Sequence, residues 1–284
     1  MHSKNAPVGV YTLYYNRFSI CSLMTLLTIR WKGQPASLEQ AIDIVEEEVD
    51  IYAGEQNEEE FLKKNWKGQV PVLLGPCDLK VTDSLQITKF LASRYTGLIP
   101  SGCEDVITAM LNELHQVWFV SLSFSAQEGR GAGILLQIQN ILAQPTTSDD
   151  YKTALQRKLQ YYATTYQADP HAPEIVAREK LKTQKFLEKI ARTRHFHNIE
   201  RKSKWIFGVE IGPTALDAHT VVFIARLIDA GHASLIGSDM LEYGTQHLES
   251  NAWRGIVDGN TTLHSLWERQ EAAKTMTVGG GAEA

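Results

Sequence analysis

The stretch from residue 65 to residue 84 limits the possible fold of this chain more than any other. Two short β-type runs, residues 70–74 and 79–82, flank Gly75 and Pro76, so the pattern predicts an antiparallel hairpin. Pro71 lies where a strand would normally donate a hydrogen bond. The first run must therefore begin there, lie at a sheet edge, or leave that position unpaired for a ligand.

Asp83 and Ser84 follow the second run and precede a segment with apolar residues at helical spacing. This order places an acid and a hydroxyl at a helix N-terminus, where backbone N–H groups point outward. Such a pair can cap the helix, and the same N–H groups can hold a carboxylate. From this stretch alone, a capped helix after an edge hairpin and a ligand site remain equally open.

The preceding residues complete a recognisable order of elements. They predict a strand at residues 8–15, a helix at 21–32, a strand at 42–51 and a short helix at 58–63. With the hairpin and the helix after Ser84, this is a βαβ unit followed by a ββα unit, with one parallel and one antiparallel pair. Glu46, Glu47 and Glu48 are interpreted as a solvated edge, and no metal site is predicted, because no His or Asp is spaced to complete a ligand set.

The pattern becomes helical after a stretch rich in Gly, Pro and Ser. We predict an α/β domain at residues 8–95, a linker at 96–104, an all-helical domain at 105–270 and a disordered tail at 271–284. One helical stripe runs from Ile107 through Leu114 to Trp118. The glycine-rich residues 129–133 lack the spacing of a dinucleotide fingerprint and predict a flexible connector. Residues 214–217 predict a capping box.

Composition excludes several classes of protein. The 284 residues are 43% hydrophobic, enough for a substantial core, and a net charge of -5 gives no sign of general nucleic-acid or membrane binding. The N-terminus has no apolar core of a signal peptide, and no run is long enough to span a membrane. Three distant cysteines without a CxxC pair argue against a disulfide framework and favour a reducing compartment, by default the cytoplasm.

Basic residues are concentrated between Arg178 and Lys204, where ten Lys or Arg accompany three acids. We interpret this segment as a solvated helix face; an anion-binding or partner surface is the alternative.

Three segments carry a resemblance to a known family. Residues 14–21 (Tyr-Tyr-Asn-Arg-Phe-Ser-Ile-Cys), residues 68–73 (Gly-Gln-Val-Pro-Val-Leu) and Asp83-Ser84, in this order, resemble the N-terminal domain of cytosolic glutathione transferases. The resemblance covers residues 8–95 and is closest to fungal transferase-like proteins, some of which act in secondary metabolism. It implies a thioredoxin-like domain with a mixed four-stranded sheet, an all-α C-terminal domain, and a homodimer. The helical part is longer than is common in the family, and we place the excess between residues 129 and 204, where it could wall a substrate pocket.

The resemblance also implies how glutathione would bind. In the family the proline after Val is cis, which leaves the Val backbone free to pair with the cysteinyl residue of the ligand. The corresponding residues here are Gln56, Gln69, Val70, Pro71, Asp83 and Ser84. The last two match the acid and hydroxyl that hold the γ-glutamyl group, and the two glutamines lie where related classes meet the glycine carboxylate. Neutral amides would hold that carboxylate less strongly than a cation.

Activation of the thiol needs a hydrogen-bond donor, because a thiol with a pKa of about 8.5 is only about 3% thiolate at pH 7. Ser19 ranks first, since it falls where the omega class, which also has Arg-Phe before it, carries its reactive Cys. Tyr14 ranks second, because it precedes Cys21 by the offset typical of tyrosine-type classes. Cys21 ranks third; it lies in a first helical turn, where the helix dipole would lower its own pKa.

These residues predict an enzyme that adds the glutathione thiolate to an electrophilic apolar substrate. Phe18, Leu114, His115 and Trp118 are the candidate pocket residues, and a core position is the alternative for Leu114 and Trp118. One alternative reaction is a glutathione-dependent cis–trans isomerisation of a conjugated olefin in secondary metabolism. A non-catalytic, transferase-like scaffold is the alternative from a different class.

Overall fold

A four-stranded sheet forms the centre of the N-terminal part of the molecule. The computed structural model describes residues 9–124, 130–165, 167–198 and 203–279. The sheet has the order β2-β1-β3-β4, and its strands are β1 (Val10–Tyr15), β2 (Asp43–Glu48), β3 (Val72–Gly75) and β4 (Leu79–Val81). Strand β1 pairs in parallel with β2 and antiparallel with β3, which forms the antiparallel hairpin with β4. The predicted mixed sheet and the βαβ-ββα order are confirmed.

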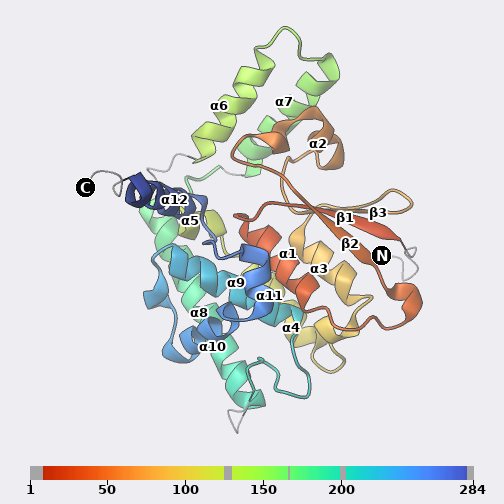
Figure 1. Cartoon of the computed structure of the whole chain (residues 1–284), viewed down its shortest axis with the longest axis vertical. Helices are drawn as coiled ribbons and strands as arrows, with labels where there is room; N and C mark the ends of the chain where they lie inside the picture. Colours follow the sequence, from red (N-terminus) through yellow and green to blue (C-terminus); the bar gives the residue numbers. More distant parts are fainter. Residues whose placement is uncertain (1–8, 125–129, 166, 199–202, 280–284) are drawn as a thin grey trace.

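Alternation along the strands sends apolar side chains to two different layers. Tyr11 and Leu13 of β1 join the main core with helices α1 (Ile20–Arg30) and α3 (Ser84–Ala92). Tyr14 points to the opposite face, where Phe61 of α2 (Glu59–Lys64) packs against it and against β3. Helices α1 and α3 therefore cover one face of the sheet and α2 the other (Figure 1).

Strand β2 lies at the edge of the sheet and carries the predicted run of acids. Glu46 pairs with Arg30 at 2.5 Å, and Glu48 pairs with Arg17 at 2.6 Å. The carboxylates of these two residues are thus engaged by arginines of the α1 layer at the solvated edge.

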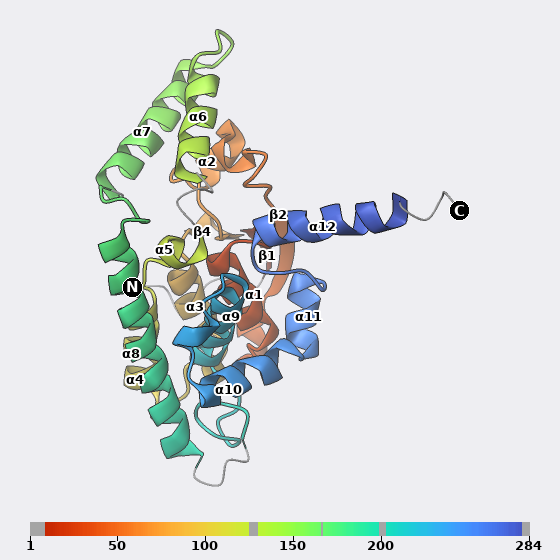
Figure 2. The same ribbon diagram turned by 90° about the vertical axis from the view of Figure 1, so that its left-hand side faces the viewer.

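The remaining regular elements of the described chain are helices. Their bounds are α4 (Glu104–Leu114), α5 (Phe119–Ser123), α6 (Arg130–Leu142), α7 (Asp149–Thr165), α8 (Pro173–His197), α9 (Ala215–Asp229), α10 (Ser238–Leu248), α11 (Asn251–Val257) and α12 (His264–Gly279). Helices α6 and α7 form a pair, called here the α6–α7 hairpin, that stands over α2 in both views (Figures 1 and 2). Helix α12 projects from the body of the molecule (Figure 2). None of the helices in the described ranges combines the length and apolar character needed to cross a bilayer.

Helix α9 is the core of the helical part and packs directly against α1. Its start has the predicted capping box, in which Thr214 and Asp217 satisfy each other's backbone N–H groups. The buried Asp217 carboxylate also accepts hydrogen bonds from Ile206 N at 2.8 Å and from the Tyr243 hydroxyl at 2.9 Å. One carboxylate therefore fixes the entry to α9, the segment before it and α10.

Three expectations differ from the structure. Residues 130–133 were expected in a flexible connector and instead begin α6, while residue 129 lies outside the described residues. Residues 271–279, expected to be disordered, continue α12, and residues 280–284 again lie outside. The helical stripe ends at Leu114, and Trp118 instead precedes the short helix α5.

Candidate active site

A cavity of about 440 Å³ lies where the N-termini of α1 and α3 meet the loop before β3. The α6–α7 hairpin lines one further side. The lining residues are Ser19, Cys21, Ile51, Tyr52, Gln56, Gly68, Gln69, Val70, Pro71, Thr82, Asp83, Ser84, Gly133, Ile134, Gln137 and Tyr162. Segments from the whole N-terminal part and from two helices far along the chain therefore share one site.

Ser19 brings a hydroxyl to this cavity as the N-cap of α1. Its Oγ accepts a hydrogen bond from Ser22 N at 3.3 Å. That bond uses a lone pair of the oxygen, so the hydroxyl proton stays available for donation. The helix N-terminus adds positive potential at the same place.

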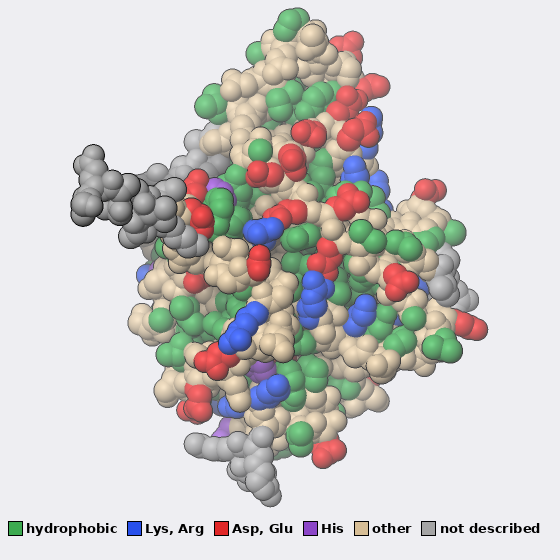
Figure 3. Space-filling model, in the orientation of Figure 1, with side chains coloured by type: hydrophobic (Ala, Val, Ile, Leu, Met, Phe, Trp, Pro, Cys, Tyr) green, Lys and Arg blue, Asp and Glu red, His purple; other side chains and the backbone are tan. Residues whose placement is uncertain are grey.

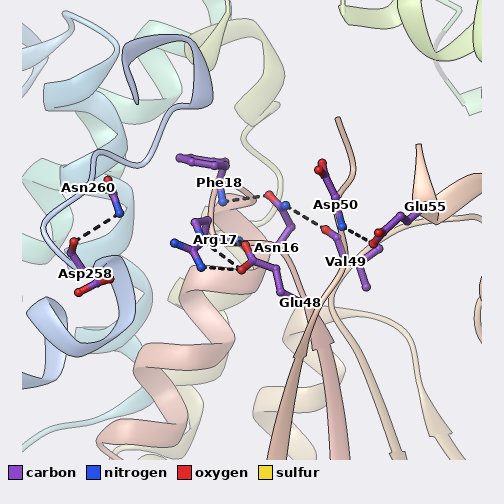
Figure 4. A network of polar contacts seen from close by, with 9 residues as sticks. All are labelled: Asn16, Arg17, Phe18, Glu48, Val49, Asp50, Glu55, Asp258 and Asn260. Carbon is purple, nitrogen blue, oxygen red and sulfur yellow. Dashed lines mark hydrogen bonds and ion pairs between the residues drawn. The ribbon is translucent and has the colours of Figure 1, made fainter. Parts of the chain in front are cut away.

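The turn that presents Ser19 is fixed from both sides (Figure 4). Asn16 Nδ2 donates to Val49 O at 2.9 Å, and Asn16 Oδ1 accepts from Phe18 N at 2.9 Å. Arg17 donates through two of its nitrogens to Glu48 of the edge strand. The turn is thus tied to the segment that follows β2, and the position of Ser19 depends on the sheet.

The loop before β3 offers an unoccupied stretch of backbone. The Val70–Pro71 peptide bond is cis. Asn65 Nδ2 donates to Gln69 O at 2.7 Å and holds the loop in place. Among the described residues, no hydrogen bond engages the N–H or the C=O of Val70. Both groups of Val70 can therefore pair with the backbone of a peptide-like ligand.

Asp83 caps the third helix with its side chain. Its Oδ1 accepts from Gln86 N at 2.9 Å, and the residue is exposed, whereas Ser84 is buried. The carboxylate and the first N–H groups of α3 lie together at the cavity. This pair can engage a ligand that carries an ammonium and a carboxylate on the same carbon.

Cys21 lies in the cavity wall, but its thiol is not activated. Burial raises the pKa of Cys21, and the negative charge of Asp83 adds to the rise, against the hydrogen bond with Ser84 and the charge of Arg226. The expectation that the dipole of α1 lowers this pKa is therefore wrong, because desolvation of the thiolate outweighs it.

Hydrogen bonds join the α6–α7 hairpin to the segment between β2 and α2. Gln137 Nε2 donates to Tyr52 O at 3.3 Å, and Asn57 Nδ2 donates to Gln137 Oε1 at 3.2 Å. From α7, the Tyr151 hydroxyl donates to Asn57 O at 2.7 Å. Residues 51–57, which supply one wall of the cavity, are therefore held by an element distant in sequence.

The cavity brings together most of the predicted site residues. Lining it are Ser19, Cys21, Gln56, Gln69, Val70, Pro71, Asp83 and Ser84. Sequence reasoning did not identify the lining residues Tyr52, Ile134, Gln137 and Tyr162. The only signal for the last three was the excess length of the helical part.

Tyr14 does not line the cavity. Strand alternation sends its ring to the α2 face, where the ring centroid lies 6.4 Å from that of Phe61 and Lys64 Nζ lies 5.0 Å from it. Burial, followed by the charge of Glu47, raises the pKa of the Tyr14 phenol. This residue is a packing residue at the α2 face of the sheet.

The four predicted pocket residues also lie outside the lining. Leu114 is part of the core, and Phe18 packs against His264 and Trp267 at the start of α12. Trp118 N donates to the buried carboxylate of Glu179 at 2.9 Å. Leu114 belongs to the predicted helical stripe, and that stripe faces the core.

His115 is the fourth of these residues, and it belongs to a buried polar chain. Its Nε2 lies 3.0 Å from His219 Nδ1, and His219 Nε2 lies 2.9 Å from Thr88 Oγ1. Burial lowers the pKa of His115 to about 4, so the ring is neutral at pH 7.

Residues 9–93 match the family model described as "Glutathione S-transferase, N-terminal domain". A comparison of the sequence with curated proteins finds no match.

Several solved structures share the fold over nearly their whole length. The beta-etherase LigF from Sphingobium sp. strain SYK-6 has a TM-score of 0.58 at 16% identity, covering 87% of this chain and 98% of that chain. A glutathione transferase homolog from Sulfitobacter with bound glutathione has a TM-score of 0.54 at 14% identity, covering 88% of this chain and 97% of that chain. Glutathione transferase F7 from Populus trichocarpa has a TM-score of 0.52 at 18% identity, covering 88% of this chain and 98% of that chain. The chain therefore has the fold of the glutathione transferases, with a thioredoxin-like N-terminal domain and a largely helical C-terminal region, and residues 9–93 are similar to the N-terminal domain of that family.

Proposed function

We propose that the protein binds glutathione, stabilises its thiolate and adds it to an electrophilic carbon of an apolar substrate. The observation that carries the proposal is the convergence of three groups on one cavity. They are the Ser19 hydroxyl at the start of α1, the free backbone groups of Val70 and the Asp83 carboxylate at the start of α3. The Sulfitobacter homolog of the same fold, solved with bound glutathione, supports the choice of ligand.

Each part of glutathione has a complementary group in the cavity. The cysteinyl backbone would pair with the N–H and C=O of Val70. The γ-glutamyl ammonium would meet the Asp83 carboxylate, and its carboxylate would meet the N–H groups and hydroxyl at Ser84. The glycine carboxylate would lie toward Gln56 and Gln69, which line the same cavity.

This pose directs the ligand sulfur to the start of α1. There the Ser19 hydroxyl would donate to the thiolate and, together with the helix N-terminus, lower the pKa of the bound thiol. The sulfur then forms a bond to the electrophilic carbon, and the displaced electron pair leaves with the departing group or moves onto the acceptor atom of the substrate. The apolar side chains of Ile51, Ile134 and Tyr52 offer the substrate a desolvated place beside the sulfur.

Ser19→Ala and Tyr14→Phe form a matched pair of variants for the thiolate step. We expect Ser19→Ala to raise the pKa of bound glutathione by about one unit or more, about 1.4 kcal/mol per unit, because the donor is lost. Tyr14→Phe should leave that pKa unchanged, since its ring lies on the other face of the sheet. The measurement is the thiolate absorbance of bound glutathione as a function of pH.

The outcomes separate the proposal from its competitors. An unchanged pKa in Ser19→Ala would remove this residue from the role, and failure to bind glutathione at millimolar concentration would overturn the proposal. Binding without turnover of any electrophile would indicate a scaffold. Product analysis with a conjugated olefin distinguishes addition, which consumes glutathione, from isomerisation, which returns it.

A further inference from the structure

The described part of the cavity wall carries no cationic side chain. Among the described residues that line it, none is Lys, Arg or His, and Asp83 is the one acid. On the proposed function, however, the ligand carries two carboxylates. Exposed acids lie at this end of the molecule, Glu58 and Glu60 at α2 and Asp149 and Asp150 at the start of α7, and lysines pair with Glu60 and Asp149. Figure 3 shows acidic side chains on this part of the surface. The described lining residues therefore offer a second carboxylate neutral amides and no positive charge.

Lys158 of α7 provides a charge in that position. Its side chain is fully buried, and its Nζ lies 2.5 Å from Asn57 Oδ1, 3.4 Å from Gln56 O and 3.3 Å from Gly68 O. Gln56 and Gly68 both line the cavity. The ammonium is thus one residue layer behind the part of the wall where the glycine carboxylate is placed in the proposed pose.

A glycine at residue 68 leaves space for this amine. Gly68 has a φ of +56°, and a Cβ at this position would lie 2.0 Å from Lys158 Nζ. A side chain at residue 68 would therefore displace the amine as well as strain the loop. Tyr151 of α7 and Gln137 of α6 contact residues 52–57 and hold the α6–α7 hairpin against this segment.

The charge of Lys158 has no acidic partner within the described residues. Its three hydrogen-bond acceptors are neutral, and the Tyr162 ring lies 5.8 Å from Nζ. The neighbouring cations Arg157 and Lys67 are turned to the rings of Trp66 and Tyr161, and the acids Glu58 and Glu59 act on Tyr151. Desolvation lowers the pKa of Lys158 to about 7. An anion in the cavity would be the counter-ion that this amine lacks.

We propose that Lys158 is the cation for the glycine carboxylate of glutathione and acts through the peptide groups of Gln56 and Gly68 without touching the ligand. Lys158 is in this sense a positioning residue. The inference rests on the proposed function. It extends the proposed glutathione site by a charged residue from the helical part of the chain. Because the anion favours the ammonium form, binding should also draw a proton onto Lys158 above pH 7.

The test compares glutathione with its glycine monoethyl ester, which keeps every group except the anionic carboxylate. Titration calorimetry at pH 7 gives both affinities for the wild type, for Lys158→Met and for the control Lys152→Met. Lys152 is on the same helix, partly exposed and 3.8 Å from Asp149. In Lys158→Met we expect glutathione to bind about tenfold more weakly, while the ester binds as in the wild type. In Lys152→Met neither affinity should change appreciably.

A second measurement needs only the wild type. At pH 8, calorimetry in buffers of different ionisation enthalpy gives the net number of protons exchanged on binding. Release of the thiol proton is common to both ligands, so we expect glutathione to take up more protons, or to release fewer, than the ester. If the wild type binds glutathione but the preference over the ester is the same in Lys158→Met, the inference is overturned and the proposed function stands. Where that variant does not fold, equal net proton exchange for the two ligands overturns it. If the wild type binds neither ligand, the proposed function itself fails.

Discussion

Asp83 combines two roles at residue scale, and two substitutions separate them. Its carboxylate caps α3 through Gln86 N and faces the cavity. Asp83→Asn keeps an acceptor for the cap and removes the charge, so we expect weaker glutathione binding with nearly unchanged stability. Asp83→Ala should lose both the cap acceptor and the charge, and its unfolding free energy should be about 1 kcal/mol lower. Urea unfolding and calorimetry measure the two effects; equal binding in wild type and Asp83→Asn would show that the charge is not used.

Lys158 makes stability depend on pH in a direction that can be worked out. Its pKa is about 7 in the folded protein and 10.5 ordinarily. Between these values the unfolded chain binds more protons than the folded protein. The free-energy cost of burying the charged Lys158 is therefore complete below pH 7 and decreases as the pH rises. From pH 7 to 9 the unfolding free energy of the wild type should therefore rise relative to that of Lys158→Met by about 1 kcal/mol per pH unit. Denaturant titrations at these pH values test this, and a constant difference would contradict the burial of the charge.

Single residues also show where sequence reasoning stops. Ser19 could be expected at the cavity because the resemblance places it where the omega class carries its reactive Cys, and its role as the N-cap of α1 became visible only in the structure. Tyr14 was misplaced because its offset from Cys21 was considered without the face of the strand to which it points. Lys158 could not be found, since a lysine on a polar helix is normally solvated and only tertiary contacts bury it.

At the scale of elements, the α6–α7 hairpin determines how rigid one wall of the cavity is. Tyr151→Phe removes the hydroxyl that donates to Asn57 O and leaves the ring packed. We expect a loss of about 1 kcal/mol and faster amide hydrogen exchange at residues 51–57, with exchange in the sheet unchanged.

Tyr161→Phe on the same helix is the control, because the Tyr161 ring lies against Trp66 and outside the cavity lining. Equal exchange at residues 51–57 in the two variants would mean that the hairpin does not restrain this wall.

The N-terminal elements were predictable for a physical reason. Strand and helix periods differ, and turn residues separate each run, so the strands, their parallel and antiparallel pairs and α1 to α3 follow from the pattern. The joining of both pairs into one four-stranded sheet followed from the family resemblance. The start of α6 was not predictable, because residues 130–133 contain two glycines that oppose a helix locally. Packing of α6 on α7 and against residues 52–57 overrides that propensity, and such contacts are invisible in a linear pattern.

At the scale of the whole molecule, Arg226 of α9 joins the two parts of the chain. This buried guanidinium donates to Phe18 O at 2.7 Å, Thr262 O at 2.7 Å and Ser123 Oγ at 3.1 Å. We expect Arg226→Met to lower the unfolding free energy by roughly 3 kcal/mol or more, since several buried acceptors lose their donor. Guanidinium unfolding measures this loss.

The exposed Arg254 on α11 serves as the matched control for that substitution. Arg254→Met should stay within about 0.5 kcal/mol of the wild type. If both variants lost the same stability, Arg226 would have no special role in joining the N-terminal turn to the helices.

The charged edge strand has a consequence for the behaviour of many molecules together. Strand β2 presents backbone groups on its outer side that a strand of a second copy could extend. Glu46 and Glu48, held by arginines from α1 and the turn before it, keep a fixed row of charge beside these groups. A strand of a second copy that paired with this edge would have to bury or break these ion pairs, and either event costs free energy. The pairs that finish the sheet thus disfavour its extension by another molecule.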